Sequence, residues 1–166
     1  MKSHWRLALP ATILLSCLSQ PVAAQSEGLQ GLVAACTAIN HGYALARDRA
    51  DKEAFAALFT DDAVFTILGE TFVGKDRIVA RLDGDDAQNF GRLLITSIDI
   101  SPTDVRTATG VTYFIMFMAP PDAKPPITEY TLFMGEYHDR YTMTADGCKF
   151  QSRDTIPLFV GERLAN

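Results

Sequence analysis

Apolar residues recur every three or four positions in three stretches of the first half of the chain, a spacing typical of amphipathic helices. The predicted helices cover Gly28 to Arg49, Lys52 to Phe59 and Lys75 to Leu82. Asp51 stands directly before the second helix, where its carboxylate can accept hydrogen bonds from the first backbone amides. The pattern therefore predicts a helix-rich N-terminal half.

Stretches rich in β-branched and aromatic residues predict two short strands among these helices and four long strands after them. They cover Ala63–Leu68, Thr71–Val73, Arg92–Ile100, Val105–Ala119, Thr128–Thr144 and Cys148–Thr155. This order predicts an α+β fold, in which three N-terminal helices pack against one curved antiparallel sheet. Within it, the segment 111–118 is apolar on both faces, which favours burial by helices on one side and by a partner subunit on the other.

The first two dozen residues follow a different pattern, which is typical of a secretory signal peptide. After a positively charged start, the apolar run Leu7 to Leu18 is too short to span a membrane. We expect cleavage after Ala24, export to the periplasm, and one folded domain over residues 25–166. A lipoprotein anchored at Cys17 is the alternative, and it fits less well because Leu15 is bulky for such an anchor signal.

Composition narrows the class of protein. The chain has 166 residues, of which 48% are hydrophobic and 21% are charged, and its formal net charge is −5. This length fits one domain with a real core, and this balance excludes a wholly disordered chain. The mild acidity, without clustered Lys or Arg, argues against a nucleic-acid partner. We also expect no membrane partner once the signal peptide is removed.

Two cysteines remain after the predicted cleavage, Cys36 and Cys148. A pair of cysteines in an exported protein can form a disulfide. The alternative is two unpaired buried thiols, because the sequence alone does not place two Cα atoms within bonding distance. The chain has no glycine-rich phosphate loop, serine elbow or zinc-protease motif. We therefore expect neither a metal nor another cofactor.

Several short stretches resemble one protein family. They are YALARDRAD from Tyr43, FTDDAVF from Phe59, GKDRI from Gly74, GEYHDRY from Gly135 and DGCKF from Asp146. Over roughly residues 29–153 they resemble the SnoaL-like domains of the nuclear transport factor 2-like superfamily, although Cys148 stands where that family usually has Trp. The resemblance implies a cone, in which a strongly bent sheet wraps around helices and leaves an apolar pocket at its open end. It defines no reaction, since the superfamily includes dehydratases, isomerases, cyclases, dehydrochlorinases, hydrolases and non-enzymatic binders.

Asp48 is the first candidate for catalysis. The scytalone dehydratase and dehydrochlorinase types, which this chain resembles, carry a pocket Asp near this position, paired with a His. A carboxylate in an apolar pocket has a raised pKa and can take part in proton transfer. The position of that His is Leu93 here, so the Asp–His dyad is missing unless another His replaces it. Alternatively, Asp48 only hydrogen-bonds to backbone where the first two helices meet.

The two histidines of the predicted mature chain are poor replacements. His41 lies about two helical turns from Asp48, which is about 10 Å along the axis. His138 follows Tyr137 on a strand, so the two side chains face opposite sides. Tyr43 and Tyr137 are the candidates that position a ligand oxygen, as tyrosines do in carbonyl chemistry.

Aromatic residues can line such a pocket, with plain core packing as the alternative for each. The candidates for ligand binding are Phe55, Phe65, Phe72, Tyr113 and Phe117. Two functions remain. The first is an exported domain that binds a small apolar molecule, with cofactor-free dehydratase, isomerase or cyclase chemistry if it is an enzyme. The second is a non-catalytic ligand-binding or dimerisation domain of the same fold, and we expect a homodimer.

Overall fold

The computed structural model describes residues 22–84 and 89–161. Most of the predicted signal peptide lies outside these ranges, so that peptide and its cleavage stay predictions. Among the helices in the described ranges, none combines the length and apolarity that a membrane crossing requires.

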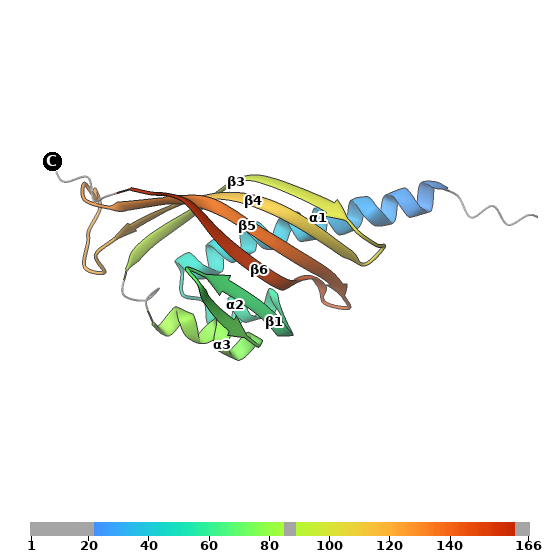
Figure 1. Cartoon of the computed structure of the whole chain (residues 1–166), viewed down its shortest axis with the longest axis horizontal. Coiled ribbons are helices and arrows are strands. Elements are labelled where there is room, and N and C mark those ends of the chain that lie inside the picture. Colours follow the sequence, from blue (N-terminus) through green and yellow to red (C-terminus); the bar gives the residue numbers. More distant parts are fainter. Residues whose placement is uncertain (1–21, 85–88, 162–166) are drawn as a thin grey trace, which may run out of the picture.

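The predicted α+β class is confirmed, with three helices and a six-stranded sheet in the described residues (Figure 1). The helices are α1 (Val22–Asp48), α2 (Lys52–Ala57) and α3 (Lys75–Ala80), which a 3₁₀ turn, η1 (Arg81–Asp83), extends. The strands are β1 (Phe59–Ile67), β2 (Glu70–Val73), β3 (Phe90–Pro102), β4 (Thr107–Ala119), β5 (Thr131–Thr144) and β6 (Gly147–Val160).

Several predicted boundaries are wrong. The second helix ends at Ala57, and Phe59 begins β1, because this buried ring pairs with Phe150 of β6. β4 begins at Thr107 and not at Val105, since the preceding backbone turns and donates hydrogen bonds to the Thr107 carbonyl. The N-cap prediction is confirmed, because the Asp51 carboxylate accepts a hydrogen bond of 3.0 Å from the backbone amide of Ala54.

The strands are arranged in the order β2-β1-β6-β5-β4-β3. The four long strands form the antiparallel meander that the sequence predicts. β1 adds to β6 in a parallel pairing, which the sequence did not predict, and β2 then pairs antiparallel with β1. Register shifts interrupt the β3–β4 and β5–β6 ladders, and such bulges bend and twist strands.

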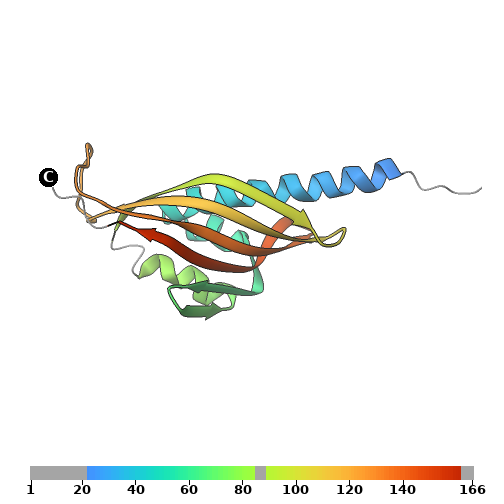
Figure 2. The same ribbon diagram turned by 45° about the horizontal axis from the view of Figure 1, so that its top comes forward.

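The helix α1 lies along the inner face of the curved meander, where it packs chiefly against β3 (Figure 2). The α2 and α3 helices and the β1–β2 hairpin lie below the meander in Figure 1. Buried aromatic rings fill the space between these layers, with Tyr43 of α1 packed against Phe55, Phe59 and Phe150. The core therefore occupies the interior of the cone, on the side of the sheet that faces α1.

A disulfide joins Cys36 of α1 to Cys148 at the start of β6, with a Cα–Cα distance of 5.2 Å. The two residues are 112 positions apart in sequence. The bond therefore links the long helix to the last strand of the meander.

Candidate functional site

Asp48 is the last residue of α1, and its carboxylate faces the start of β3. The backbone amide of Leu93 donates to both carboxylate oxygens, at 3.1 and 3.2 Å, and the guanidinium of Arg47 lies 3.7 Å away. Burial raises the pKa of Asp48, while the Leu93 amide and the charges of Arg47 and Arg92 oppose the rise. The side chain is 14% exposed. Asp48 is therefore held in place, and it keeps a route to solvent.

No histidine reaches Asp48 within the described residues. Leu93 occupies the position of the expected His, and its buried aliphatic side chain has no titratable proton. His41 is exposed on α1. His138 lies on the other face of the sheet, 2.8 Å from the Glu136 carboxylate. The Asp–His dyad of the dehydratase type is thus replaced by an Asp–backbone contact.

Tyr43 and Tyr137 meet inside the cone, with their ring centroids 5.7 Å apart. Both are buried, and Tyr137 also stacks on Phe114 at 4.3 Å. Burial raises the pKa of Tyr137 well above its usual range, and nearby Tyr43 raises it further. The charges of Arg153 and Arg47 lower this pKa, but their effect is smaller than that of burial. The phenol of Tyr137 therefore stays protonated at neutral pH, so its O–H is available as a donor.

A buried ion pair lies next to these tyrosines, and sequence reasoning missed it. The Nε and Nη2 of Arg153 each donate to the Asp139 carboxylate at 2.8 Å, and both side chains are fully buried. Burial alone would lower the pKa of Arg153, but the charge and hydrogen bonds of Asp139 raise it above its ordinary value. The pair therefore stays ionised in the core.

Three further side chains complete this polar network. Asn40 accepts from Arg153 Nη2 and from the Thr112 hydroxyl, and it donates to the Tyr141 hydroxyl at 3.0 Å. Tyr141 in turn donates to Asp139 at 2.7 Å. Charged groups are tolerated in a core when such hydrogen bonds satisfy them.

Arg153 also connects the ion pair to the aromatic core. Its guanidinium carbon lies 4.2 Å from the ring centroid of Tyr43 and 4.0 Å from those of Tyr137 and Phe150. A guanidinium at these distances is attracted by the negative faces of aromatic rings. Two of the predicted site residues are therefore packed directly against a buried cation.

One sequence signal could have pointed to this network. Tyr137, Asp139 and Tyr141 alternate along β5, so a carboxylate that shares a face with two core tyrosines must be buried. Arg153 was harder to predict, because a register shift lies between it and the preceding buried residue of β6, Phe150. Alternation alone therefore does not fix which way Arg153 faces.

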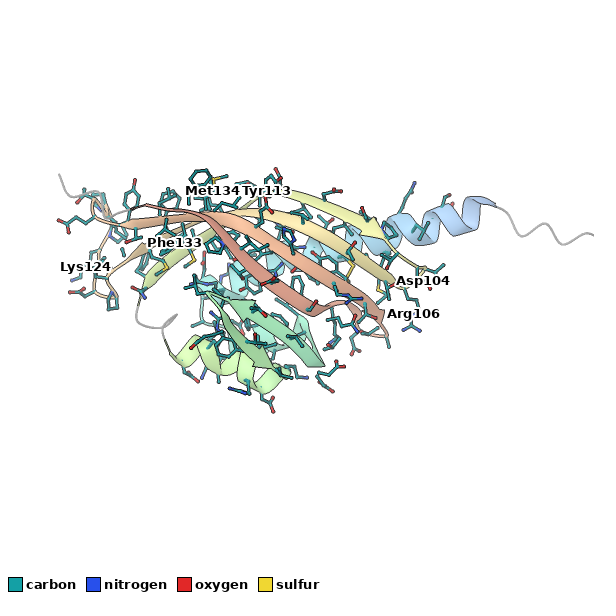
Figure 3. All side chains as sticks on the ribbon, in the orientation of Figure 1. Asp104, Arg106, Tyr113, Lys124, Phe133 and Met134 are labelled. Atoms are coloured by element: carbon teal, nitrogen blue, oxygen red, sulfur yellow. A yellow bond between two sulfur atoms is a disulfide. The ribbon has the colours of Figure 1, made fainter. Side chains whose placement is uncertain are left out.

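The five aromatic candidates lie in different environments. Phe55 and Phe65 are core residues, and Phe65 and Phe72 flank the guanidinium of Arg81. Tyr113 is 43% exposed on the outer face of β4, and Figure 3 shows it beside Met134 on the side away from α2 and α3. Phe117 lies four positions further along β4, so its side chain is on the same outer face. The structure thus does not bring Tyr113 or Phe117 to the interior.

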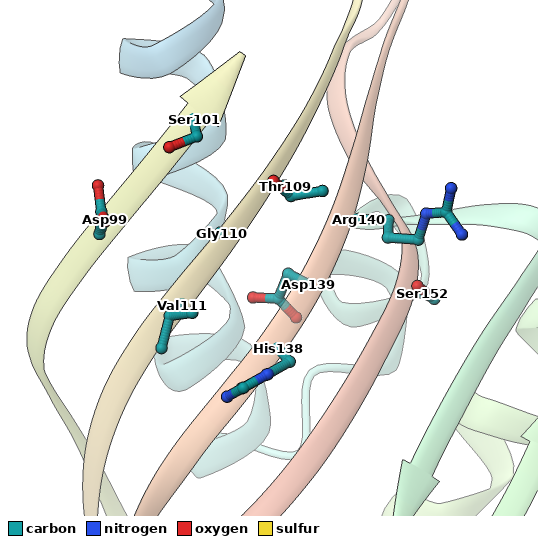
Figure 4. Close-up of a pocket in the computed structure, with 9 residues that line it drawn as sticks. All are labelled: Asp99, Ser101, Thr109, Gly110, Val111, His138, Asp139, Arg140 and Ser152. Carbon is teal, nitrogen blue, oxygen red and sulfur yellow. The ribbon is translucent and has the colours of Figure 1, made fainter. Parts of the chain in front are cut away.

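Two of the surface hollows among the described residues have volumes of about 410 and 450 Å³, and neither of these two includes Asp48, Tyr43 or Tyr137. One, of about 410 Å³, lies on the outer face of the meander, and Figure 4 shows the residues that line it. The other, of about 450 Å³, lies beside the start of α3. The outer hollow contains the exposed His138, whereas the carboxylate of Asp139 points to the buried side.

The sequence profile of the SnoaL-like domain family matches residues 32–154, whereas no curated protein sequence matches significantly. A candidate scytalone dehydratase from Novosphingobium aromaticivorans superposes with a TM-score of 0.73 at 16% identity, over 85% of this chain and 93% of that chain. For hexachlorocyclohexane dehydrochlorinase LinA-type3 from Novosphingobium barchaimii, the TM-score is 0.66 at 14% identity, over 87% and 92%. For a protein of unknown function from Mycobacterium tuberculosis, it is 0.65 at 24% identity, over 82% and 75%. These likenesses support the predicted cone fold.

Proposed function

The chain belongs to the SnoaL-like domain family, and we propose that it binds a small, largely apolar molecule inside its cone, beside Asp48, Tyr43 and Tyr137. One observation carries the proposal. At the end of α1, the partly exposed carboxylate of Asp48 has a raised pKa and is held by the backbone amide of Leu93. Tyr43, on the preceding part of the same helix, packs against Tyr137. Titratable groups with perturbed pKa values, next to an apolar interior, are common at ligand sites.

The chemistry that fits this arrangement is cofactor-free proton transfer of the lyase or isomerase type. In dehydration of a β-hydroxy ketone, Asp48 would take the proton from the carbon beside the carbonyl, and a tyrosine phenol would donate a hydrogen bond to the carbonyl oxygen. The departing hydroxide would then take up that proton and leave as water. Two similar structures carry the names of a dehydratase and a dehydrochlorinase, which supports a reaction of this class.

The proposed location is outside the cytoplasm, after removal of the predicted signal peptide. The Cys36–Cys148 disulfide supports this location, because disulfides persist in oxidising compartments such as the periplasm.

The test uses the wild-type domain and the Asp48→Asn variant, with Asp62→Asn as a matched change at an exposed position. Acetophenone and isopropylbenzene serve as binding probes in thermal-shift and calorimetric titrations. 4-Hydroxy-4-phenylbutan-2-one serves as the reaction probe, since its dehydration gives an enone that absorbs in the near ultraviolet. We expect Asp48→Asn to abolish turnover and Asp62→Asn to keep it. If ligands bind and Asp48→Asn changes neither binding nor turnover, the acid–base role is wrong.

A second candidate function is self-association through the outer face of the sheet. Tyr113, Leu94 and Phe159 are exposed, and the sheet face that carries Tyr113 is not covered by other described elements. Leu94 and Phe159 lie in one cross-strand row with Ile115 and Met134, two positions along β4 from Tyr113. An apolar surface of this kind favours protein contacts. Tyr113→Lys should convert a homodimer to a monomer in sedimentation analysis, whereas Val73→Lys, at an exposed position of β2, should not. A wild-type chain that sediments as a monomer at micromolar concentration would refute this candidate.

A further inference from the structure

The last three residues of β6 are apolar and exposed. Leu158, Phe159 and Val160 have exposed fractions of 50%, 63% and 62%. The other large apolar residues that are exposed in the described ranges stand alone in the sequence. Single exposed apolar residues are normal on protein surfaces, whereas a contiguous group marks a contact surface. We refer to Leu158, Phe159 and Val160 as the apolar tip.

The side chains of the apolar tip do not share one face of the sheet. Phe159 is opposite Met134 in the β5–β6 ladder, on the outer face, and Val160 is opposite Phe133, on the inner face. A register shift leaves Leu158 out of this ladder. Sheet packing between two copies through the outer face would cover Phe159 and leave Val160 in water. A phase that surrounds the end of the strand contacts all three side chains, so it accounts for the whole tip.

The apolar tip lies at the end of the meander that also carries the contact of Asp48. The ladders show that β3 begins, β4 ends, β5 begins and β6 ends here. The Asp48 carboxylate accepts from the amide of Leu93, which lies near the start of β3. Figures 1 and 2 show this end of the meander projecting past α2 and α3. The tip is therefore at a projecting end of the molecule, on the side of the proposed site.

Groups that suit a lipid headgroup region border the apolar tip. Lys124, in the loop between β4 and β5, is exposed and has no ion pair within the described residues, and Figure 3 shows it at this end of the molecule. Arg92 is exposed on β3. Long cationic side chains reach lipid phosphates, and tyrosines such as Tyr130 of the same loop are enriched at membrane interfaces. Asp122 and Glu129 balance the two cations, so apolar contact is the main attraction.

We infer that the apolar tip docks peripherally onto a lipid bilayer. Its three side chains enter the boundary between headgroups and acyl chains, while Lys124 and Arg92 bind lipid phosphates. Such a contact needs no membrane-spanning helix. Composition led us to expect no membrane partner, and the exposed tip is the reason to revise that expectation. The docking goes beyond the proposed function, and it brings the proposed site to the phase in which a small apolar ligand dissolves.

Co-sedimentation with vesicles of phosphatidylcholine and phosphatidylglycerol tests the inference. The chain from Gln25, the predicted mature form, is used so that the signal peptide does not contribute. Leu158→Ser and Val160→Ser each remove one side chain of the tip that self-association through the outer face does not use. Val105→Ser is the matched control, because Val105 is 59% exposed between β3 and β4, at the opposite end of the meander.

We expect wild type to bind these vesicles, and Leu158→Ser and Val160→Ser each to lower the partition coefficient about fivefold or more. Val105→Ser should keep the wild-type partition coefficient. Lys124→Glu should weaken binding to these vesicles and have less effect with phosphatidylcholine alone. The melting temperatures of all four variants should equal that of wild type, because substitutions at exposed positions have little effect on stability.

Wild-type protein that stays in the supernatant at millimolar lipid overturns the inference, and so does a Val105→Ser variant that loses as much binding as Val160→Ser. If Leu158→Ser or Val160→Ser instead converts a dimer to a monomer in lipid-free sedimentation analysis, while the vesicles bind nothing, a second copy covers the tip and lipid docking is wrong. Acetophenone binding is measured without lipid, so failure of the proposed function is recognised separately.

Discussion

The ion pair between Arg153 and Asp139 gives the sharpest prediction about stability. In Asp139→Asn, the guanidinium keeps its charge and loses the carboxylate that accepts two of its hydrogen bonds. Tyr141 loses the charged acceptor of its O–H as well. Removing one partner of a buried ion pair costs about 3–5 kcal/mol, because the remaining charge is left without compensation. We expect a loss of this size in the free energy of unfolding.

Urea unfolding, monitored by far-ultraviolet circular dichroism, measures this loss in the free energy of unfolding. The midpoint should fall while the slope of the transition stays constant, since the change affects stability and not the surface exposed on unfolding. Asp154→Asn is the matched control, because Asp154 is exposed on the same strand directly beside Arg153. Its effect should stay within about 0.5 kcal/mol.

A double substitution separates the charge from the packing. Asp139→Leu combined with Arg153→Met removes both charges at similar volume, and such replacements of whole buried pairs are often neutral or stabilising. The double variant should therefore recover most of the stability that Asp139→Asn loses. If Asp139→Asn lowers the free energy of unfolding by less than about 1 kcal/mol, no more than Asp154→Asn does, the reasoning is refuted. The Arg153 charge would then not depend on Asp139 for its stability in the core.

Three further predictions concern α1 and its neighbours. Because the folded pKa of Asp48 is raised above 3.8, its contribution to stability is fully present below that pH and is lost as the pH rises through the folded pKa. Asp48→Asn should therefore lose less stability, relative to wild type, at pH 7 than at pH 3 in urea unfolding, and a difference independent of pH would contradict the shift. Mass spectrometry of non-reduced, alkylated protein should find Cys36 and Cys148 joined, and replacing both by Ser should cost about 4–5 kcal/mol for a loop of this length, whereas two alkylated thiols would exclude the bond. Asp51→Ala should cost about 1 kcal/mol through loss of the α2 cap, and an unchanged urea midpoint would show that the cap contributes nothing.

The sequence predicts the elements of this fold well because hydrophobic periodicity is a local property. The helix at Lys52 and the four long strands follow from spacing and turn residues alone. The parallel pairing of β1 with β6 does not, because it joins segments about ninety positions apart, as the hydrogen bond from Phe150 N to the Leu58 carbonyl illustrates. Pairings over such distances depend on the whole packing arrangement.

The candidate site was predicted in part for the same reason. Asp48, Tyr43 and Tyr137 were recognised by residue type and resemblance, and the structure brings the two tyrosines together. The partner of Asp48 is a backbone amide of Leu93, which has no signature in the sequence because every residue except proline carries one. The inward orientation of Arg153 depends on a register shift, so it could only be seen in three dimensions.

A crystal structure of the domain with bound acetophenone tests the central claim most directly. The account predicts the phenyl ring in the interior, against Tyr43 and Tyr137, with the carbonyl oxygen about 3 Å from the hydroxyl oxygen of one of these tyrosines. Acetophenone bound only in the outer hollow beside His138, with the interior side chains unmoved and no ligand among them, would contradict it.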